Sequence, residues 1–189
     1  MDWHCRGTMP LQGDEPVGPI PEGADPADYD KLRRRVMWTM PSGLYVVGSR
    51  AGDRMNLMTC NWATQVSSAP KLVAISVEHE ALTHELIHEG QVFSISIIDR
   101  EDRAIVRKFT KPVEVDAAAK TLNEFPYVEK SSGAPILAQA VAWLDCRVTQ
   151  EVLVGTHTLF VGEVVDAGFS KDEATPVLRM EDTRMNYGG

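Results

Sequence analysis

Cysteine is scarce in this sequence, and no two cysteines have the spacing of a metal or redox motif. The 189-residue chain has three: Cys5, Cys60 and Cys146. Their odd number and wide spacing argue against a disulfide framework or a zinc knuckle. Reduced thiols are typical of the cytoplasm, so we expect a cytoplasmic protein.

Long apolar runs and an excess of basic residues are also missing. No run is long enough to span a bilayer, and the N-terminus has no apolar segment of the signal-peptide type. The formal net charge of −8 argues against a nucleic-acid binder, which normally has a basic face. Neither GxGxxG nor GxxxxGK[ST] occurs, so the standard nucleotide loops are not available. We expect no nucleic-acid partner and no membrane partner.

The chain does have the length and apolar content of one domain, since 43% of its residues are hydrophobic. Residues 1–27 contain many Pro, Gly, Asp and Glu and show no apolar period. This predicts a flexible tail, or an arm that packs on a partner. Residues 28–189 are predicted to form a single domain. At its start, "DPADYDKLRRRVM" predicts a short helix with Asp25 as cap and Pro26 in the first turn.

Five later segments are rich in Val, Ile, Phe and Trp and are separated by Gly, Pro and Asp. They predict strands and read "GLYVVGSR", "KLVAISVE", "QVFSISII", "AVAWLDCRVTQEVLV" and "TLFVGEVVDAG". Short helical pieces are expected near 82–89, 100–109 and 116–124, with Gly90 ending the first in the left-handed conformation. Many strands with few short helices predict a mainly β fold, a closed or nearly closed antiparallel barrel.

The segment "HELIH", residues 84–88, matches the H-E-x-x-H pattern of zinc peptidases. The helix around it is short, because Gly90 follows at once, and no third ligand follows at a regular spacing. We therefore favour a small amphipathic helix with Leu86 and Ile87 toward the core and His84 and His88 toward water. A zinc peptidase is the third and weakest functional hypothesis.

The segment "NLMTCNWATQVSS", residues 56–68, places hydroxyls, amides and an indole on two adjoining strands and their turn. A flavin mononucleotide (FMN) needs such groups: donors for its phosphate, polar partners for its ring edge and a flat neighbour for its ring face. Each residue also has a purely structural interpretation. Trp62 can be plain core, Ser67 and Ser68 can bond their own turn, and Thr83 can be a simple helix cap.

At these residues the chain resembles the flavin reductase-like family with the FMN-binding split-barrel fold, in particular its flavoredoxin-type branch. The resemblance spans most of residues 36–168. Its most specific part is "GTHTLFVGEV", close to the family pattern G-D-H-T-L-F-x-G-E-V. It implies an antiparallel Greek-key split barrel, a homodimer, and FMN or FAD as the flavin.

The resemblance also implies roles for particular residues. Asn56 and Trp62 would border the flavin ring and its side chain, and Thr59, Cys60 and Asn61 would meet the pyrimidine edge. The ribityl chain or the phosphate would lie near Ser67, Ser68 and Thr83, with Lys120 as the cation and Lys108 and Lys111 as competitors. His157 would sit where the nicotinamide docks, and Tyr187 would cover the site.

Thr156 departs from the family pattern, because it stands where the family has an aspartate before the histidine. The resemblance implies an NAD(P)H:flavin oxidoreductase that passes hydride to flavin and supplies a monooxygenase or another acceptor. The alternative is a flavoredoxin-like electron carrier without rapid NAD(P)H turnover.

Overall fold

A computed structural model describes residues 18–183, which fall into two units, residues 18–40 and residues 41–183. Tyr187 and Cys5 lie outside the described residues. The first unit contains helix α1 (Pro26–Met37), which confirms the helix expected there. Pro26 occupies its first turn, and the Asp25 carboxylate accepts a 3.0 Å hydrogen bond from the Asp28 N–H.

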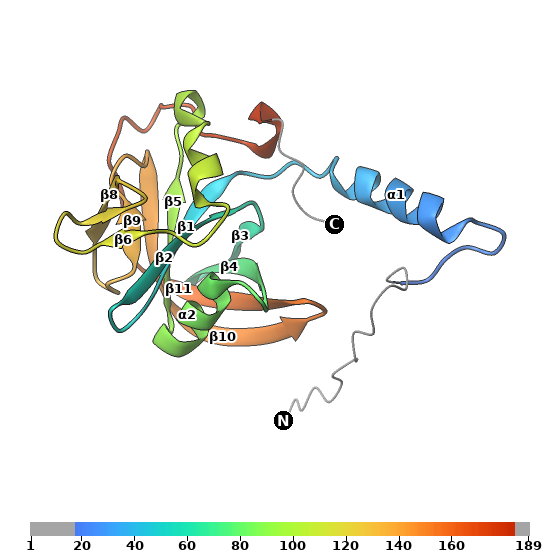
Figure 1. Cartoon of the computed structure of the whole chain (residues 1–189), viewed down its shortest axis with the longest axis horizontal. Helices are drawn as coiled ribbons and strands as arrows, with labels where there is room; N and C mark the ends of the chain where they lie inside the picture. Colours follow the sequence, from blue (N-terminus) through green and yellow to red (C-terminus); the bar gives the residue numbers. More distant parts are fainter. Residues whose placement is uncertain (1–17, 184–189) are drawn as a thin grey trace. The chain divides into compact units, whose positions relative to one another are not determined.

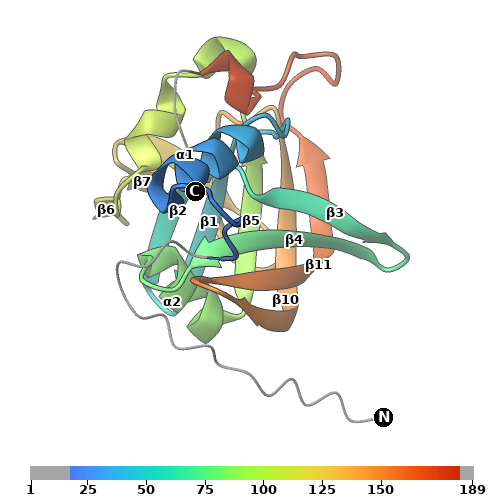
Figure 2. The same cartoon turned by 90° about the vertical axis from the view of Figure 1, so that its right-hand side faces the viewer.

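The second unit is built on one antiparallel sheet, seen in Figures 1 and 2. The order of its strands is β2-β1-β5-β10-β11-β4-β3. Their bounds are β1 (Tyr45–Ala51), β2 (Arg54–Cys60), β3 (Ala63–Ser68), β4 (Lys71–Glu78), β5 (Val92–Ile97), β10 (Ala142–Val154) and β11 (His157–Phe169). The five strands expected from composition and alternation are confirmed, and so is a mainly β, antiparallel barrel.

Strands β2 and β3 follow each other in sequence but form the two opposite edges of this sheet. The sequence suggested two adjoining strands, and this expectation is wrong. β2 pairs with β1 and β3 pairs with β4, and the chain crosses between the two edges at Asn61 and Trp62. Within residues 18–183 the sheet is therefore a barrel that remains split between β2 and β3.

A second, smaller sheet lies beside the barrel in Figure 1 and consists of β6 (Val115–Asp116), β7 (Thr121–Leu122), β8 (Phe125–Glu129) and β9 (Pro135–Leu137). A helix expected near 116–124 is absent from this described segment. Lys120, Asn123 and Glu124 have φ of 53°, 49° and 68°, which a right-handed helix does not allow. The piece expected near 100–109 is two 3₁₀ turns, η1 (Arg100–Asp102) and η2 (Ile105–Phe109), and a third, η3 (Met180–Asp182), lies near the end of the described chain.

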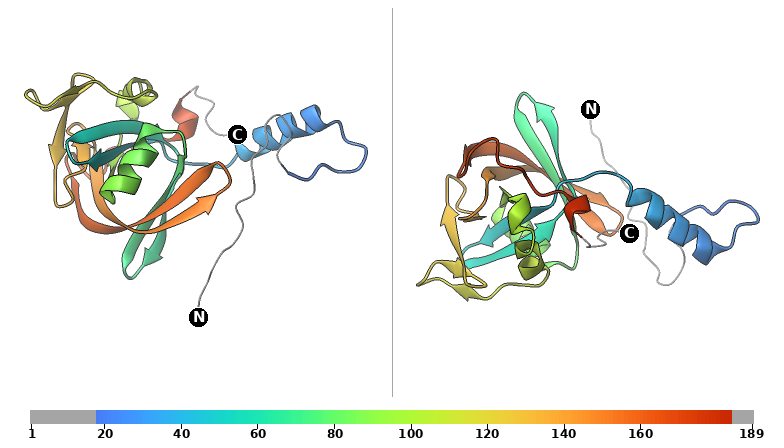
Figure 3. Two further views of the ribbon diagram at one scale, coloured as in Figure 1. Left: turned by 60° about the horizontal axis from the view of Figure 1, so that its bottom comes forward. Right: turned by 90° about the horizontal axis from the view of Figure 1, so that it is seen from above.

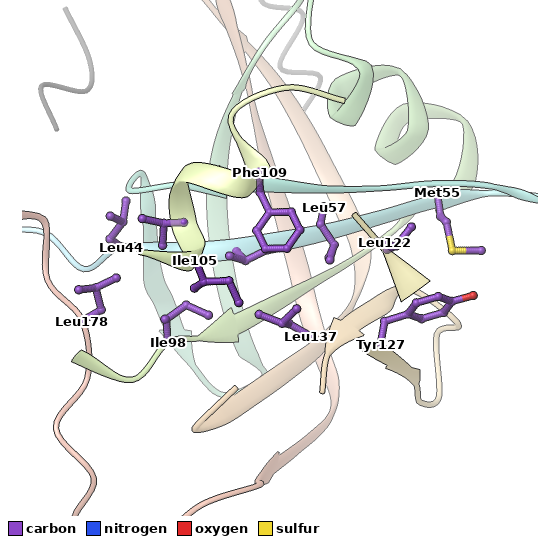
Figure 4. Packing of buried hydrophobic residues seen from close by; sticks show 12 residues of the cluster. Leu44, Met55, Leu57, Ile98, Ile105, Phe109, Leu122, Tyr127, Leu137 and Leu178 are labelled. Carbon is purple, nitrogen blue, oxygen red and sulfur yellow. The ribbon is translucent and has the colours of Figure 1, made fainter. Parts of the chain in front are cut away.

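Two clusters of buried apolar side chains stabilise the second unit. One joins β1, β2, η2 and the small sheet around Phe109, Leu57 and Leu137, as Figure 4 shows. The other fills the barrel around Phe93 and Phe160 and includes Ile87 of helix α2 (Leu82–Gly90). Because Ile87 belongs to this interior, α2 covers one end of the barrel, as seen in the left view of Figure 3.

Helix α2 begins and ends differently from expectation. Its N-cap residue is Ala81, which makes no side-chain cap hydrogen bond, so Thr83 is not the cap. The left-handed residue at its other end is Gln91, with φ of 56°, and not Gly90. Gly90 is needed for space: a Cβ there would lie 1.7 Å from the backbone oxygen of Arg50. No helix among residues 18–183 has both the length and the apolar content to cross a membrane.

Candidate functional site

The end of β4, the start of α2 and the start of β11 meet at one end of the barrel. Glu78 is the last residue of β4, and it lies opposite His157 in the β4–β11 register. The Ala81 N–H then donates to the Glu78 carbonyl at 3.1 Å, which turns the chain into α2. Trp62 joins this corner, because its carbonyl accepts the Ser76 N–H at 3.0 Å.

Trp62 and His157 form an aromatic pair at this corner. Their ring centroids are 4.9 Å apart and their planes are tilted by 54°. Trp62 is 39% exposed, so it is not the plain core residue that was one interpretation of the sequence. The Thr156 hydroxyl lies 2.8 Å from His157 Nδ1, where the family pattern has a carboxylate. The result is a partly open aromatic corner in which the indole and the imidazole are inclined to each other.

Asn56 joins three elements through one buried side chain. Its Nδ2 donates to Thr83 Oγ1 at 2.9 Å, and its Oδ1 accepts the Val113 N–H at 3.1 Å. Asn56 is 3% exposed and Thr83 is 1% exposed. Strand β2, the first turn of α2 and the segment around Val113 are therefore held together. No motif in the sequence points to the contact with Val113.

The start of α2 is suited to an anion. The first N–H groups of a helix have no partner within the helix, and a side chain at the N-cap usually satisfies one of them. The alanine at the N-cap of α2 makes no such bond. An uncapped start of a nine-residue helix leaves N–H groups and the positive end of the helix dipole for an external acceptor.

The residues between Asn56 and Trp62 shape the crossing from β2 to β3. Thr59 is fully buried, and its hydroxyl donates to the Val106 carbonyl, so its side chain braces η2. Burial raises the pKa of the Cys60 thiol to about 11, and the hydrogen bond from the backbone N–H of Trp62 opposes this effect. Asn61 is 8% exposed. A ligand at this crossing would meet mainly backbone atoms and Trp62.

Four residues implied by the resemblance lie away from this corner or outside the described chain. Ser67 and Ser68 end β3 beside the start of β4, with Ser68 opposite Lys71, whereas Thr83 follows the far end of β4. Figure 2 shows the β3–β4 hairpin tip and α2 at opposite ends of β4, so these hydroxyls do not form one phosphate site with Thr83. Lys120 is exposed in the β6–β7 turn, and Tyr187 lies outside the described residues.

A pocket of about 440 Å³ lies toward the β3–β4 hairpin. It is lined mainly by apolar side chains of the barrel, among them Ile95, Ile97, Leu144 and Val164, with Lys71 and Gln65 from the hairpin. The β4 residues that line it are Lys71, Leu72 and Val73, at the start of that strand, so the pocket lies away from α2, which follows its end.

The histidines of "HELIH" have separate partners. His84 Nε2 lies 2.8 Å from Thr158 Oγ1, and His88 Nδ1 lies 2.7 Å from Glu151 Oε2. His84 faces water only in part, because one side of its ring packs on Phe160, with the ring centroids 5.2 Å apart. Within residues 18–183, no group of three or more His, Cys, Asp or Glu side chains is placed to hold a metal ion.

Comparison with known proteins identifies the domain. A family model described as "Flavin reductase like domain" matches residues 37–188. An "NADH-dependent FAD reductase" of Streptomyces globisporus is 34% identical over 158 residues, which cover 80% of this chain and 82% of that protein. A "High molecular weight rubredoxin" of Moorella thermoacetica is 33% identical over 138 residues, 70% of this chain but only 58% of that protein.

A solved structure shows the same arrangement of strands. The "NADH:FAD oxidoreductase SgcE6" of Streptomyces globisporus C-1027 superimposes with a TM-score of 0.69 at 31% identity. The aligned residues cover 85% of this chain and 93% of that one. The split-barrel fold implied by the resemblance is confirmed.

Two histidines at this end of the barrel, His84 and His157, have a pKa below the ordinary value. Burial, and then repulsion from His79 and His88, lower the pKa of His84. Burial also lowers the pKa of His157; Glu78 opposes this effect and His79 adds to it. Near these pKa values the folded state therefore binds fewer protons than the unfolded state. The contribution of His84 and His157 to the free energy of unfolding is present above the ordinary histidine pKa of about 6.5 and falls as the pH drops below it.

We predict that the titration midpoints of His84 and His157 lie below about 6.5. The NMR shifts of the imidazole protons as a function of pH measure them. In His79→Gln both midpoints should rise, because one repelling charge is removed. Glu101→Gln, a change on exposed η1, serves as the matched control. Midpoints for His84 and His157 that stay fixed in His79→Gln would show that the three rings do not interact.

Proposed function

This chain belongs to the flavin reductase-like family, and we propose that it is an NAD(P)H:flavin oxidoreductase that uses FMN, with FAD as a possible substitute. One observation supports this most strongly: an uncapped helix start and an open indole–imidazole pair share one end of the barrel. An aromatic ring with a phosphate on a flexible side chain needs both.

The described residues fit such a ligand. Trp62 and His157 would pack against the ring, and backbone groups from Cys60 to Trp62 would meet its polar edge. The first N–H groups of α2 would hold the phosphate, while Asn56 keeps that helix start beside β2. Thr59 and Thr83 would support the site without contacting the ligand through their hydroxyls, because both side chains are buried and hydrogen-bonded to other residues of the protein.

When bound, the flavin supplies the acceptor for a hydride from the nicotinamide. The role of the chain is to bind and orient the two rings. His157 is proposed to face the nicotinamide. Its neighbour Thr156 is a neutral hydroxyl, so it orients the imidazole at Nδ1 without adding a negative charge that would favour the imidazolium form.

A flavoredoxin-like carrier is the alternative, and NAD(P)H turnover distinguishes the two. We expect the purified protein to oxidise NADH or NADPH rapidly when FMN is added, because the half-exposed Trp62 gives the nicotinamide access to the ring. The measurement is the loss of absorbance at 340 nm with each cofactor, with and without FMN. Tightly bound flavin without turnover would favour the carrier, and a protein that binds no flavin would refute both.

Lys111 is the cation that we propose for the phosphate, in place of Lys120. The segment that contacts Asn56 includes Val113, two residues beyond Lys111, and Asn56 in turn contacts Thr83 at the start of α2. Lys120 lies in the turn between β6 and β7. Both lysines are exposed, so neither substitution should disturb the fold.

We expect Lys111→Ala to weaken FMN binding about tenfold, since a charge-assisted hydrogen bond contributes about 1.5–3 kcal/mol. Riboflavin, which lacks the phosphate, should bind Lys111→Ala and the native protein equally. Lys120→Ala is the matched control and should leave both affinities unchanged. Fluorescence titration measures all four, and a loss confined to Lys120→Ala would reverse the assignment.

We also propose that the protein works as a homodimer, in a reducing cytoplasm, and delivers reduced flavin to a monooxygenase or another acceptor. Support for the dimer comes from the apolar pocket beside the β3–β4 hairpin, from the free edge of β3, and from Phe169, which is 60% exposed. Light scattering at micromolar concentration should give twice the chain mass of 20.9 kDa. A monomer at that concentration would contradict the proposal.

A further inference from the structure

One face of the β10–β11 hairpin has an exposed apolar side chain beside a group of imidazoles. Leu153 is 70% exposed and lies directly opposite Thr158 in the β10–β11 register. Residues opposite each other in an antiparallel pair project from the same face. Thr158 contacts His84, and Glu151, two residues before Leu153, contacts His88. Leu153 therefore shares its face with the contacts to α2, which lies beside this hairpin in Figure 1.

The imidazoles on this side form a row. The His84 and His88 rings are stacked, with centroids 6.3 Å apart and planes within 16°. The His79 ring meets His84 edge-on at 5.3 Å. His79 also lies at the candidate flavin site, because its N–H donates to the Thr156 carbonyl at 3.1 Å, next to His157. The row thus leads from the Trp62–His157 pair to the Leu153 face.

The carboxylates around this face already have partners. Glu151 accepts hydrogen bonds from His88 and from the Gln91 side chain, at 2.7 and 2.6 Å. Glu85 and Glu89 of α2 both pair with Arg54, at 2.6 and 2.5 Å. Paired charges leave a surface suited to a flat, uncharged group with polar edges, and less suited to a free phosphate.

We propose that this face, formed by Leu153, His84 and His88, binds the adenine ring of a dinucleotide. The proposal rests on the proposed function, because a flavin reductase meets adenine in FAD and in NAD(P)H. Imidazole and apolar side chains provide stacking partners for a base. Gln91 and Glu151 lie at the edge of the face, where an adenine presents its amino group and ring nitrogens.

The order of the elements agrees with the order of the groups in such a ligand. The flavin or nicotinamide ring would occupy the Trp62–His157 corner, and the first turn of α2 lies between that corner and His88 in the chain. A dinucleotide also has its phosphates between its two rings. FMN ends at its phosphate, so it would not reach the Leu153 face.

The test compares ligands with and without adenine on the full chain. Leu153→Ser and His88→Ala remove one exposed side chain each, and Val128→Ser, a 41% exposed residue of β8, is the matched control. Fluorescence titration gives the affinities for FMN and FAD. Steady-state kinetics give KM for NADH and for reduced nicotinamide mononucleotide, which lacks adenosine.

Because stacking of one base contributes about 1–3 kcal/mol, we expect each variant to lose about tenfold in affinity for one dinucleotide. A loss for FAD with unchanged FMN binding assigns the face to FAD. A raised KM for NADH alone, with unchanged KM for reduced nicotinamide mononucleotide, assigns it to NADH. If Leu153→Ser and His88→Ala have the same affinity for FAD and the same KM for NADH as Val128→Ser, and still bind FMN, the adenine site alone is overturned. Failure of the native protein to bind FMN would overturn the proposed function and this inference together.

Discussion

The side-chain amide of Asn56 is the contact on which the candidate site depends most. It uses its nitrogen on Thr83 and its oxygen on Val113, and it is almost fully buried. A buried amide group without hydrogen-bond partners lowers the stability of the folded state. The fold is therefore most stable when Thr83 and Val113 are both in place beside Asn56. Asn56 thereby fixes the start of α2 and the segment after η2 against β2, one edge of the split barrel.

The split itself explains why the site lies at this end of the fold. Because β2 and β3 are opposite edges, the residues that join them cross the barrel end and do not form a hairpin. Trp62 leaves that crossing beside the start of β11, where it meets His157. The same end contains the uncapped start of α2. One ring surface and one anion site are thus set by the topology of a single sheet.

Local patterns in the sequence predicted the strands well, because alternation and β-branched residues act over a few neighbours. They predicted the helical segment near 116–124 wrongly, because Lys120, Asn123 and Glu124 have positive φ. The Asn123 side chain accepts from the Glu114 N–H and donates to the Lys108 carbonyl, contacts that a local pattern does not reveal. The resemblance pointed to Trp62, Asn56 and His157, and these lie at or beside one corner of the barrel.

Contacts between residues far apart in the chain could not be predicted from local sequence patterns. Ser67 and Ser68 look adjacent to the site along the chain, but β4 separates them from Thr83. The hydroxyls of Thr59 and Thr83 look free in the sequence and are buried in the fold. The Val113 contact, and the meeting of α2 with the β10–β11 hairpin through His84 and His88, join residues distant in sequence with no common motif.

The central claim is that the start of α2, held by Asn56 and without a side-chain cap, binds the phosphate of a flavin whose ring lies against Trp62 and His157. Isothermal titration of the native protein with FMN and with riboflavin tests it most directly. The account predicts binding of both, with FMN at least about tenfold tighter, because only FMN carries the group that a helix start attracts. Equal affinities for the two flavins would contradict it.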